Sequence, residues 1–354
     1  MKSVCVSAAV VVILIAASLL FLQRISIQHK KVEEQPPLPF ERKEGETQYD
    51  LTYRWKGYRE ESFEGIFSVS KADLAEAEKE FGYEPAELAS VLAAEDLRMR
   101  EEIIRSLKNL AREEIAESKY APYIVIEEKG ALAFNLNFRA SPRLHDNVKA
   151  ELDRISRRLA EEQDSRQKRG IQELEAKKKE FLGSRGLRYV GGKLGINYGL
   201  VIAWNRPRLK PVLESIQKQN ADLSLRRFLD FLLSFLQQVR YRIPPLQENN
   251  RFILGLWVPF RVLVENLGDC DSKGVTFSAF WTNLKRYPLI LIKVPNHMFV
   301  GVAVPMFGND SVTVGGLRYT LCEVTGPSRL PPGLLTNYSR LCLDGGQYVY
   351  ELVR

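Results

Sequence analysis

The hydrophobic pattern of the chain begins with an uncharged apolar run over residues 4–22. Its length is close to the roughly 20 residues that a helix needs to cross a bilayer. A cleaved signal peptide is the alternative, but its apolar core is shorter, about 7–15 residues, and it ends in small residues. This run ends in Leu20, Phe21 and Leu22, which make a poor cleavage site. The pattern therefore favours an uncleaved membrane anchor over residues 1–22.

A polar spacer and a mixture of strands and helices follow the run. Residues 23–46 contain three prolines, a composition typical of an extended linker. Residues 49–69 have the pattern of short strands and turns. Ser70 is expected to cap a first helix that Gly82 closes, and Pro85 to begin a second helix that runs to residue 118.

A long, highly charged helical segment is predicted over residues 143–185. Its apolar positions repeat as a coiled-coil-like seam at Val148, Leu152, Ile155 and Leu159. The seam is then lost and resumes at Ile171, so Gly170 is predicted to be the tip of a helical hairpin. Two interpretations remain open for 143–185, an arm that binds a protein partner and a hairpin packed on its own domain.

The remaining patterns divide the body of the protein into two regions. Residues 123–138 alternate as a β-hairpin, and residues 189–204 read as strand. Pro207 and Pro211 then lead into a helical run, and Ser224 caps a further helix. We therefore expect an N-terminal α+β region over 47–204 and a C-terminal domain over 205–354.

Composition and charge narrow the functional classes. With 354 residues, 45% of them hydrophobic, the chain is long enough for two domains with buried cores. Its net charge of +7 is spread over mixed-sign segments, without a basic stripe interleaved with aromatic residues, which argues against a nucleic-acid partner. Histidines are few and no acidic loop has calcium-ligand spacing, so we expect no metal and no cofactor.

The cellular compartment follows from the expected anchor only in part. Three basic residues follow the apolar run closely and only Lys2 precedes it, so a strict positive-inside count places the body in the cytoplasm. A short tail before the anchor and a large folded region after it are, however, usual in exported proteins. On that ground we expect a membrane-anchored protein whose catalytic domain is periplasmic or extracellular. Cys322 and Cys342 either pair there or remain buried thiols.

The strongest chemical signal is Gly-Asp-Cys-Asp-Ser-Lys at residues 268–273. Gly268 permits a tight turn, Asp269 and Asp271 suit a helix cap, and an apolar face follows, so Cys270 is expected at a helix N-terminus. The helix dipole there favours a thiolate, and the free N–H groups of the first turn donate to an oxyanion. The two aspartates oppose thiolate formation, so activation has to come mainly from an imidazolium partner.

His297 and Glu323 are the candidates for the base and the acid that orients it. His29 lies beside the apolar run and His145 in the charged helical region, which leaves His297 as the only plausible base. His297 opens a predicted strand, and alternation places it with Phe299 on the face expected to meet the cysteine helix. Glu323 lies in the next predicted strand, where a buried carboxylate requires a partner. The alternatives are a structural histidine and an exposed glutamate on an edge strand.

At these positions the sequence resembles the transglutaminase-like branch of the papain-like cysteine protease superfamily. The residues that carry this resemblance are Gly-Asp-Cys-Asp at a helix start, His297 at a strand start and Glu323-Val324-Thr325 at the end of the next strand, preceded by residues 239–241 and 259–263. The resemblance covers roughly residues 220–330. It implies an α+β fold with a papain-like core, in which a cysteine on a helix N-terminus packs on an antiparallel sheet. The helical and β-hairpin region with its coiled-coil-like segment precedes this core.

The resemblance also implies the role of each site residue. Cys270 would be the nucleophile, His297 the base and Glu323 the orienting acid, a position at which the family most often has aspartate. An oxyanion donor from a side chain upstream of the cysteine is implied as well, and Trp257 and Tyr241 are the candidates.

Two functions from different classes are consistent with these residues. The first is a thiol-dependent acyl-transfer enzyme acting on amide bonds of a protein or peptide, by hydrolysis as in a cysteine protease or by transamidation. The second is a catalytically inactive transglutaminase-like binding or assembly module at the membrane. The reactivity of Cys270 distinguishes the two.

Overall fold

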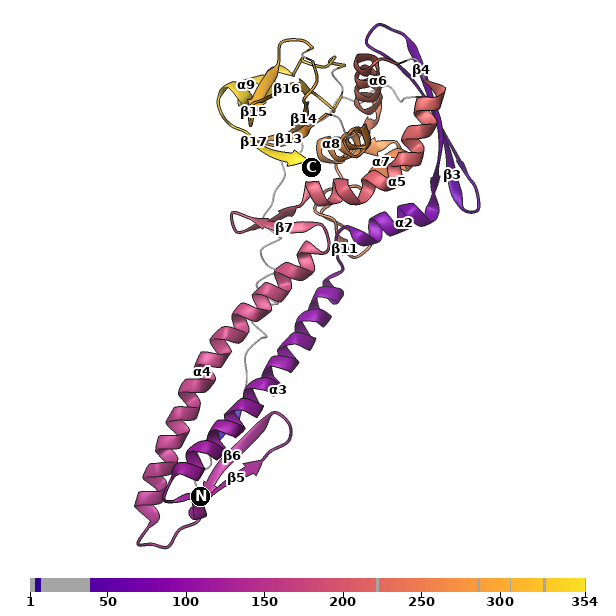
Figure 1. Cartoon of the computed structure of the whole chain (residues 1–354). Helices are drawn as coiled ribbons and strands as arrows, with labels where there is room; N and C mark the ends of the chain where they lie inside the picture. The colour runs from indigo at the N-terminus through magenta and orange to yellow at the C-terminus, as the bar shows by residue number, and fades with distance from the viewer. Residues whose placement is uncertain are drawn as a thin grey trace. The chain divides into compact units, whose positions relative to one another are not determined.

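The computed structural model describes residues 4–7, 39–220, 223–284, 287–305, 307–326 and 329–353. It is a mixed α/β protein (Figure 1) that divides into two compact units. The first unit contains Met1–Gln28 and Pro85–Phe181, and the second contains His29–Glu84 and Leu182–Arg354. The expected boundary near residue 205 falls within helix α5 (Tyr198–Gln219), in the interior of the second unit.

The first unit consists of two long helices and a small antiparallel sheet. Helix α3 (Pro85–Glu117) and helix α4 (His145–Gly183) run side by side (Figure 1). Between them the chain forms the turn η2 (Ala121–Tyr123) and the predicted hairpin of β5 (Ile124–Glu128) and β6 (Ala133–Phe138). The seam predicted in α4 is buried against α3 and this hairpin, so it packs within its own unit. The core residues are Ile104, Leu107, Ala111, Ile124, Phe134, Leu136, Val148, Leu152, Ile155 and Leu159.

The predicted hairpin tip at Gly170 is wrong, because α4 continues through this residue without a break. Gly170 is buried and faces Met99 of α3. The apolar repeat weakens before Gly170 because neighbouring residues form ion pairs along the helix surface, such as Arg166 with Glu162 and Lys168 with Asp164. Charged pairs three or four residues apart support a helix without an apolar stripe.

The predicted membrane anchor is also wrong, and with it the expectation of a membrane-bound protein with an exported domain. No helix among the described residues is long and apolar enough to cross a bilayer. Val4–Ser7, at the start of the apolar run, form strand β1, which pairs antiparallel with β6. An uncharged apolar run suits a buried strand as well as a membrane helix, and composition alone does not separate them. Residues 8–22, and residues 23–38 of the expected spacer, lie outside the described part of the chain.

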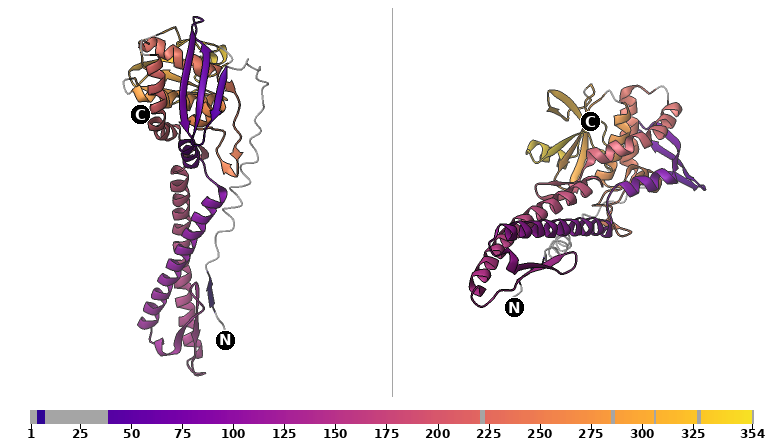
Figure 2. Two further views of the ribbon diagram at one scale, coloured as in Figure 1. Left: turned by 90° about the vertical axis from the view of Figure 1, so that its right-hand side faces the viewer. Right: turned by 60° about the horizontal axis from the view of Figure 1, so that its bottom comes forward.

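The second unit begins with a three-stranded antiparallel sheet, in the order β2 (Phe40–Glu44), β3 (Gln48–Lys56) and β4 (Ser62–Ser70). Figure 2 shows these strands side by side in its left view. Residues 40–44, expected in the spacer, thus belong to the sheet. Buried and exposed positions alternate along β4, and the buried aromatic face packs on helix α6 (Leu225–Gln238). Trp55 and Phe63, for example, both contact the ring of Phe231. Ser70 caps helix α2 (Lys71–Glu80), and Ser224 caps α6, as predicted.

The segment predicted as strand up to residue 204 is only partly strand. Strands β7 (Leu187–Val190) and β8 (Lys193–Ile196) form a hairpin, after which Asn197 caps α5. Pro207 and Pro211 lie inside α5 rather than before it. Proline in a helix interior removes a backbone hydrogen bond. We attribute the persistence of the helix to burial of one face, which includes Val201, Ile202, Leu209, Val212 and Leu213.

The main sheet of the second unit is antiparallel and holds five strands. Their order is β15 (Ser311–Val314), β16 (Leu317–Cys322), β14 (His297–Val302), β13 (Leu289–Val294) and β17 (Val349–Val353). Helix α8 (Cys270–Trp281) covers one face, where Gly274 abuts Met298 of β14. Helix α9 (Asn337–Asp344) covers the other face, where Cys342 clusters with Phe299. The expectation that the face of Phe299 meets the cysteine helix is therefore wrong.

Short elements connect these layers and lead the chain to the start of α8. They are β9 (Arg240–Tyr241), β10 (Gln247–Glu248), β11 (Arg251–Phe252), α7 (Pro259–Glu265) and β12 (Leu267–Gly268), with the turn η3 (Thr282–Leu284) after α8. Strand β12 pairs parallel with β9, so that Gly268 lies opposite Tyr241. Cys322 and Cys342, which were expected either to pair or to remain thiols, are buried free cysteines.

The packing of α4 on α3 predicts the effect of filling Gly170. A Cβ at this position would lie 3.5 Å from Met99 Sδ, an ordinary contact distance. Gly170→Ala should therefore raise the free energy of unfolding by about 0.5–1 kcal/mol, since alanine favours a helix interior over glycine. Denaturant unfolding followed by circular dichroism measures this change. Gly186→Ala is the contrasting variant. Its φ is +74° and its Cβ would lie 3.0 Å from Phe81, so it should destabilise. A destabilised Gly170→Ala protein would contradict the described packing.

Candidate functional site

Cys270 lies at the start of α8, as predicted from the residues around it. Asp269 caps the helix in an extended conformation, and its carboxylate accepts a hydrogen bond from the Ser272 N–H at 2.9 Å. The pairing of β12 with β9 fixes the approach to the helix, and the Arg242 N–H donates to the Gly268 carbonyl at 3.3 Å. Cys270 is only 6% exposed, so the sulfur is inside the protein rather than on its surface.

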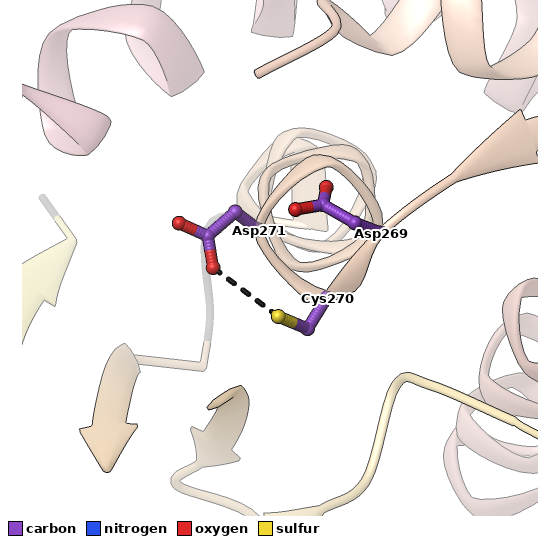
Figure 3. A group of neighbouring side chains, drawn as sticks. All are labelled: Asp269, Cys270 and Asp271. Carbon is purple, nitrogen blue, oxygen red and sulfur yellow. Dashed lines mark hydrogen bonds between the residues drawn. The ribbon is translucent and has the colours of Figure 1, made fainter. Parts of the chain in front are cut away.

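The thiol of Cys270 donates a hydrogen bond to the neighbouring carboxylate of Asp271, with 3.4 Å between Sγ and Oδ1 (Figure 3). Burial raises the pKa of the Cys270 thiol well above its ordinary value, and the charges of Asp271 and Asp269 raise it further. The backbone N–H of Met298 opposes these effects by donating to the sulfur. In this arrangement Cys270 is a neutral thiol, not a thiolate.

His297 and Glu323 are in direct contact. The distance between His297 Nε2 and Glu323 Oε1 is 2.5 Å. Glu323 lies one residue beyond the end of β16, is fully buried, and accepts a second hydrogen bond from the Ser339 hydroxyl of α9 at 2.9 Å. Burial lowers the pKa of His297, but the hydrogen bond and charge of Glu323 and the charges of Asp271 and Asp269 outweigh it, so the net shift is upwards. The imidazole is thus favoured as a proton acceptor.

Cys270 meets the same strand that carries His297. Its sulfur contacts the N–H of Met298, the residue next to His297. The carboxylates beside the cysteine also raise the pKa of His297, which places their charges close to the ring. The structure therefore brings His297 and Glu323 into contact and Cys270 to the start of β14. The hydrogen bond of the thiol itself is to Asp271.

The two candidate oxyanion donors, Trp257 and Tyr241, differ in the side chains that lie near their polar groups. Trp257 is buried, and its indole N–H donates to Glu248 Oε2 at 3.2 Å. Burial raises the pKa of Tyr241, and the nearby groups of Cys270, Asp269 and Asp271 raise it further. Tyr241 therefore keeps its proton and lies close to the cysteine, which makes it the better placed of the two candidates.

Lys273 is a titratable residue of this site for which the sequence predicted no role. It is fully buried on α8, its ammonium donates to the Val239 carbonyl, and it lies 6.0 Å from the ring centre of Tyr241. No carboxylate forms an ion pair with it within the described residues. Burial lowers the pKa of Lys273 to about 7 and raises that of Asp269 to about 7.

Three further residues complete the polar contacts of the site, and none of them was predicted from the sequence. Ser339 bonds the carboxylate of Glu323, and Gln237 donates to the Glu323 carbonyl at 2.6 Å. Tyr198, the first residue of α5, donates to the second carboxylate oxygen of Asp271. Ser339 and Tyr198 each follow a helix cap, Thr336 and Asn197, but a cap marks only the start of a helix and not the contacts with Glu323 and Asp271.

Asp269, Cys270 and Asp271 are the residues best placed to hold a metal ion, since their ligand atoms lie within 4.8 Å of one another. Their donor atoms already have partners in the protein. Asp269 accepts from Ser272, and Asp271 accepts from Tyr198 and Cys270. Because these atoms already have partners within the protein, we assign no metal to them.

Comparisons with family models, with curated proteins and with solved structures found no match to this chain. The resemblance over residues 220–330 therefore depends on the local motifs described above. The function has to be argued from the geometry of the site.

Lys273 generates a prediction about stability and pH. The unfolded chain binds the lysine proton up to about pH 10.5, whereas the folded protein releases it near pH 7. Between these values the unfolded state binds more protons, so the unfolding free energy rises with pH, by an amount on the order of a few kcal/mol in total. Lys273→Met removes this dependence. Denaturant unfolding between pH 7.5 and 10 should therefore show the variant gaining relative stability towards the lower pH.

The exposed Lys193 provides the control for this experiment. Lys193→Met should leave the pH dependence of the wild type unchanged. The absolute stability of Lys273→Met is not the readout, because the variant also leaves the Val239 carbonyl without its donor. A difference between wild type and Lys273→Met that does not change with pH would contradict the prediction.

Proposed function

We propose that the protein is a thiol-dependent acyl-transfer enzyme of the transglutaminase-like type, acting on amide bonds in a protein or peptide. Cys270 is the nucleophile, His297 the base and Glu323 the acid that orients it. The observation that carries the proposal is the 2.5 Å contact between His297 and the fully buried Glu323, next to the peptide group that meets the Cys270 sulfur. A buried carboxylate that orients an imidazole is typical of sites in which the imidazole activates a nucleophile.

The order of elements supports a papain-like core. A cysteine at a helix N-terminus packs on an antiparallel sheet, the second strand after the helix, β14, carries the histidine, and β16, which pairs with β14, leads to the carboxylate. The ring nitrogen of His297 that does not bond Glu323 is Nδ1, and the proposal assigns the thiol proton to this atom. Glutamate stands here in place of the commoner aspartate; it lies one residue beyond the end of β16, and its carboxylate reaches His297.

The chemistry requires only groups that the chain supplies. His297 takes the thiol proton, and the thiolate attacks the amide carbonyl carbon while the carbonyl π electrons move to oxygen. The C–N bond then breaks, the leaving amine takes the proton from His297, and a thioester with Cys270 remains. Water or an amine attacks the thioester, loses its proton to His297, and the sulfur recovers a proton as it leaves. The first choice gives hydrolysis and the second transamidation.

A non-catalytic module is the second candidate, and a specific observation favours it. Cys270 is 6% exposed and its thiol bonds Asp271 rather than an imidazole. A protein with this site that never releases the thiol would keep the fold and act through binding alone.

Covalent labelling separates the two functions. An amide-mimicking electrophile should label wild-type protein at Cys270, and Cys270→Ala should remove that label. His297→Ala should slow labelling by about a hundredfold or more, the usual size of a general-base contribution. Glu323→Gln should slow it too, because the amide does not support the imidazolium. Mass spectrometry of the labelled peptide identifies the site and gives the rate.

His145→Ala is the matched control, since it removes the described histidine of the other unit. It should label at the wild-type rate. Equal labelling of wild type and Cys270→Ala, or an unchanged rate in His297→Ala, would exclude the catalytic function and favour the binding module.

A further inference from the structure

A second set of side chains is connected to Cys270 through Asp271. One carboxylate oxygen of Asp271 accepts a hydrogen bond from the Cys270 thiol, and the other accepts a hydrogen bond from the Tyr198 hydroxyl. Lys293 of β13 places its ammonium 3.7 Å from the ring centre of Tyr198. Three elements far apart in the sequence, α5, α8 and β13, thus supply one continuous series of contacts that ends on the sulfur.

We infer that Tyr198, Asp271 and Lys293 form a latch that holds the Cys270 thiol as a donor to Asp271 and so keeps it from forming an ion pair with His297. Asp271 is the positioning residue that touches the thiol, and Tyr198 and Lys293 act through it. The inference deepens the proposed function and rests on it for the role of His297. The contact between Cys270 and Asp271 is itself independent of any activity (Figure 3).

Each member of the latch has the chemistry that its place requires. Burial raises the pKa of Tyr198 well above its ordinary value, and Asp271 raises it further, so Tyr198 remains a hydrogen-bond donor. A cation over an aromatic ring is attracted to its face, which fixes the ring of Tyr198 and strengthens the hydroxyl as a donor. Within the described residues no ion pair or hydrogen bond of Lys293 is found, and its charge also interacts with the carboxylates of Asp271 and Glu351. Tyr198 in turn is anchored as the first residue of α5, beside Gly199, whose N–H donates to Glu351.

The latch opposes the first step of the proposed reaction directly. A carboxylate that accepts the S–H bond is a like charge next to the thiolate that must form. Asp271 is half-buried rather than enclosed, so it can turn towards solvent when a substrate enters. The thiol is then released from Asp271 and donates its proton to Nδ1 of His297. Closure without substrate keeps the sulfur protonated.

Several charged or titratable groups face Cys270, and a test must separate them from Asp271. They come from α5, β9, β13, and α8 with its cap, and they are Tyr198, Tyr241, Lys293, Asp269, Asp271 and Lys273. Among them Asp271 alone forms a side-chain hydrogen bond with the sulfur in the described residues. A substitution that removes only its charge therefore addresses the latch.

The test is the rate of Cys270 alkylation by iodoacetamide as a function of pH in the full chain. Asp271→Asn keeps the shape of the side chain and removes its charge. It should raise the rate at pH 7 about tenfold or more and lower the midpoint of the pH profile by about one unit or more. Tyr198→Phe frees the carboxylate to rotate and should raise the rate by a smaller factor. The double variant should match Asp271→Asn alone, because the two residues act as one unit.

Controls distinguish the latch from unfolding and from the proposed function. Asp344→Asn removes an exposed aspartate of the same unit and should leave the rate unchanged. Unfolding would expose Cys322 and Cys342, so their alkylation is followed by mass spectrometry in every variant. An unchanged rate and midpoint in folded Asp271→Asn would overturn the latch, even if His297→Ala still slowed labelling. Faster alkylation in Asp271→Asn with no effect of His297→Ala would support the latch and overturn the catalytic function.

Discussion

The removal of Glu323 from water is the constraint on which the arrangement of the second unit depends. An unpaired buried carboxylate costs several kcal/mol, so its two oxygens require partners from elsewhere in the fold. His297 of β14 supplies one and Ser339 of α9 the other. The backbone of Glu323 is held as well, by Gln237 of α6. The main sheet, the helix on its far face and the helix beneath the N-terminal sheet are thereby tied to one residue.

The ionisable groups at the start of α8 are also buried, wholly or in part, but their partners differ from those of Glu323. Asp269, Asp271 and Lys273 are close to Cys270, but among the described residues none of them forms an ion pair. Burial raises the pKa of Asp269 and lowers that of Lys273, so that both lie at about 7. The unfavourable free energy of burying these charged groups is therefore not offset by ion pairs at this site. The reactivity of the site then depends on which group accepts from the thiol: Asp271 accepts its hydrogen bond in the structure, and His297 takes its proton in the proposed reaction.

Local patterns were sufficient where short-range physics decides the structure. Caps at Ser70 and Ser224, the hairpin at 123–138 and the helix start at Cys270 all follow from side chains that bond backbone groups a few residues away. Local patterns were insufficient where tertiary packing overrides the intrinsic helix propensity of a residue. Gly170 stays helical against α3, and α5 accommodates two prolines because its buried face compensates for the lost hydrogen bonds.

The amino-acid sequence alone singled out the residues of the candidate site. A scarce histidine, a cysteine at a capped helix start and a glutamate near a strand end are visible without coordinates, because residue type and local periodicity are encoded along the chain. Which side chains share a proton was decided only by the tertiary structure. Alternation grouped His297 with Phe299, but the helix that covers that face is α9, and the partner of Cys270 is Asp271, held by Tyr198. Such contacts depend on the packing of elements distant in sequence, which no local pattern records.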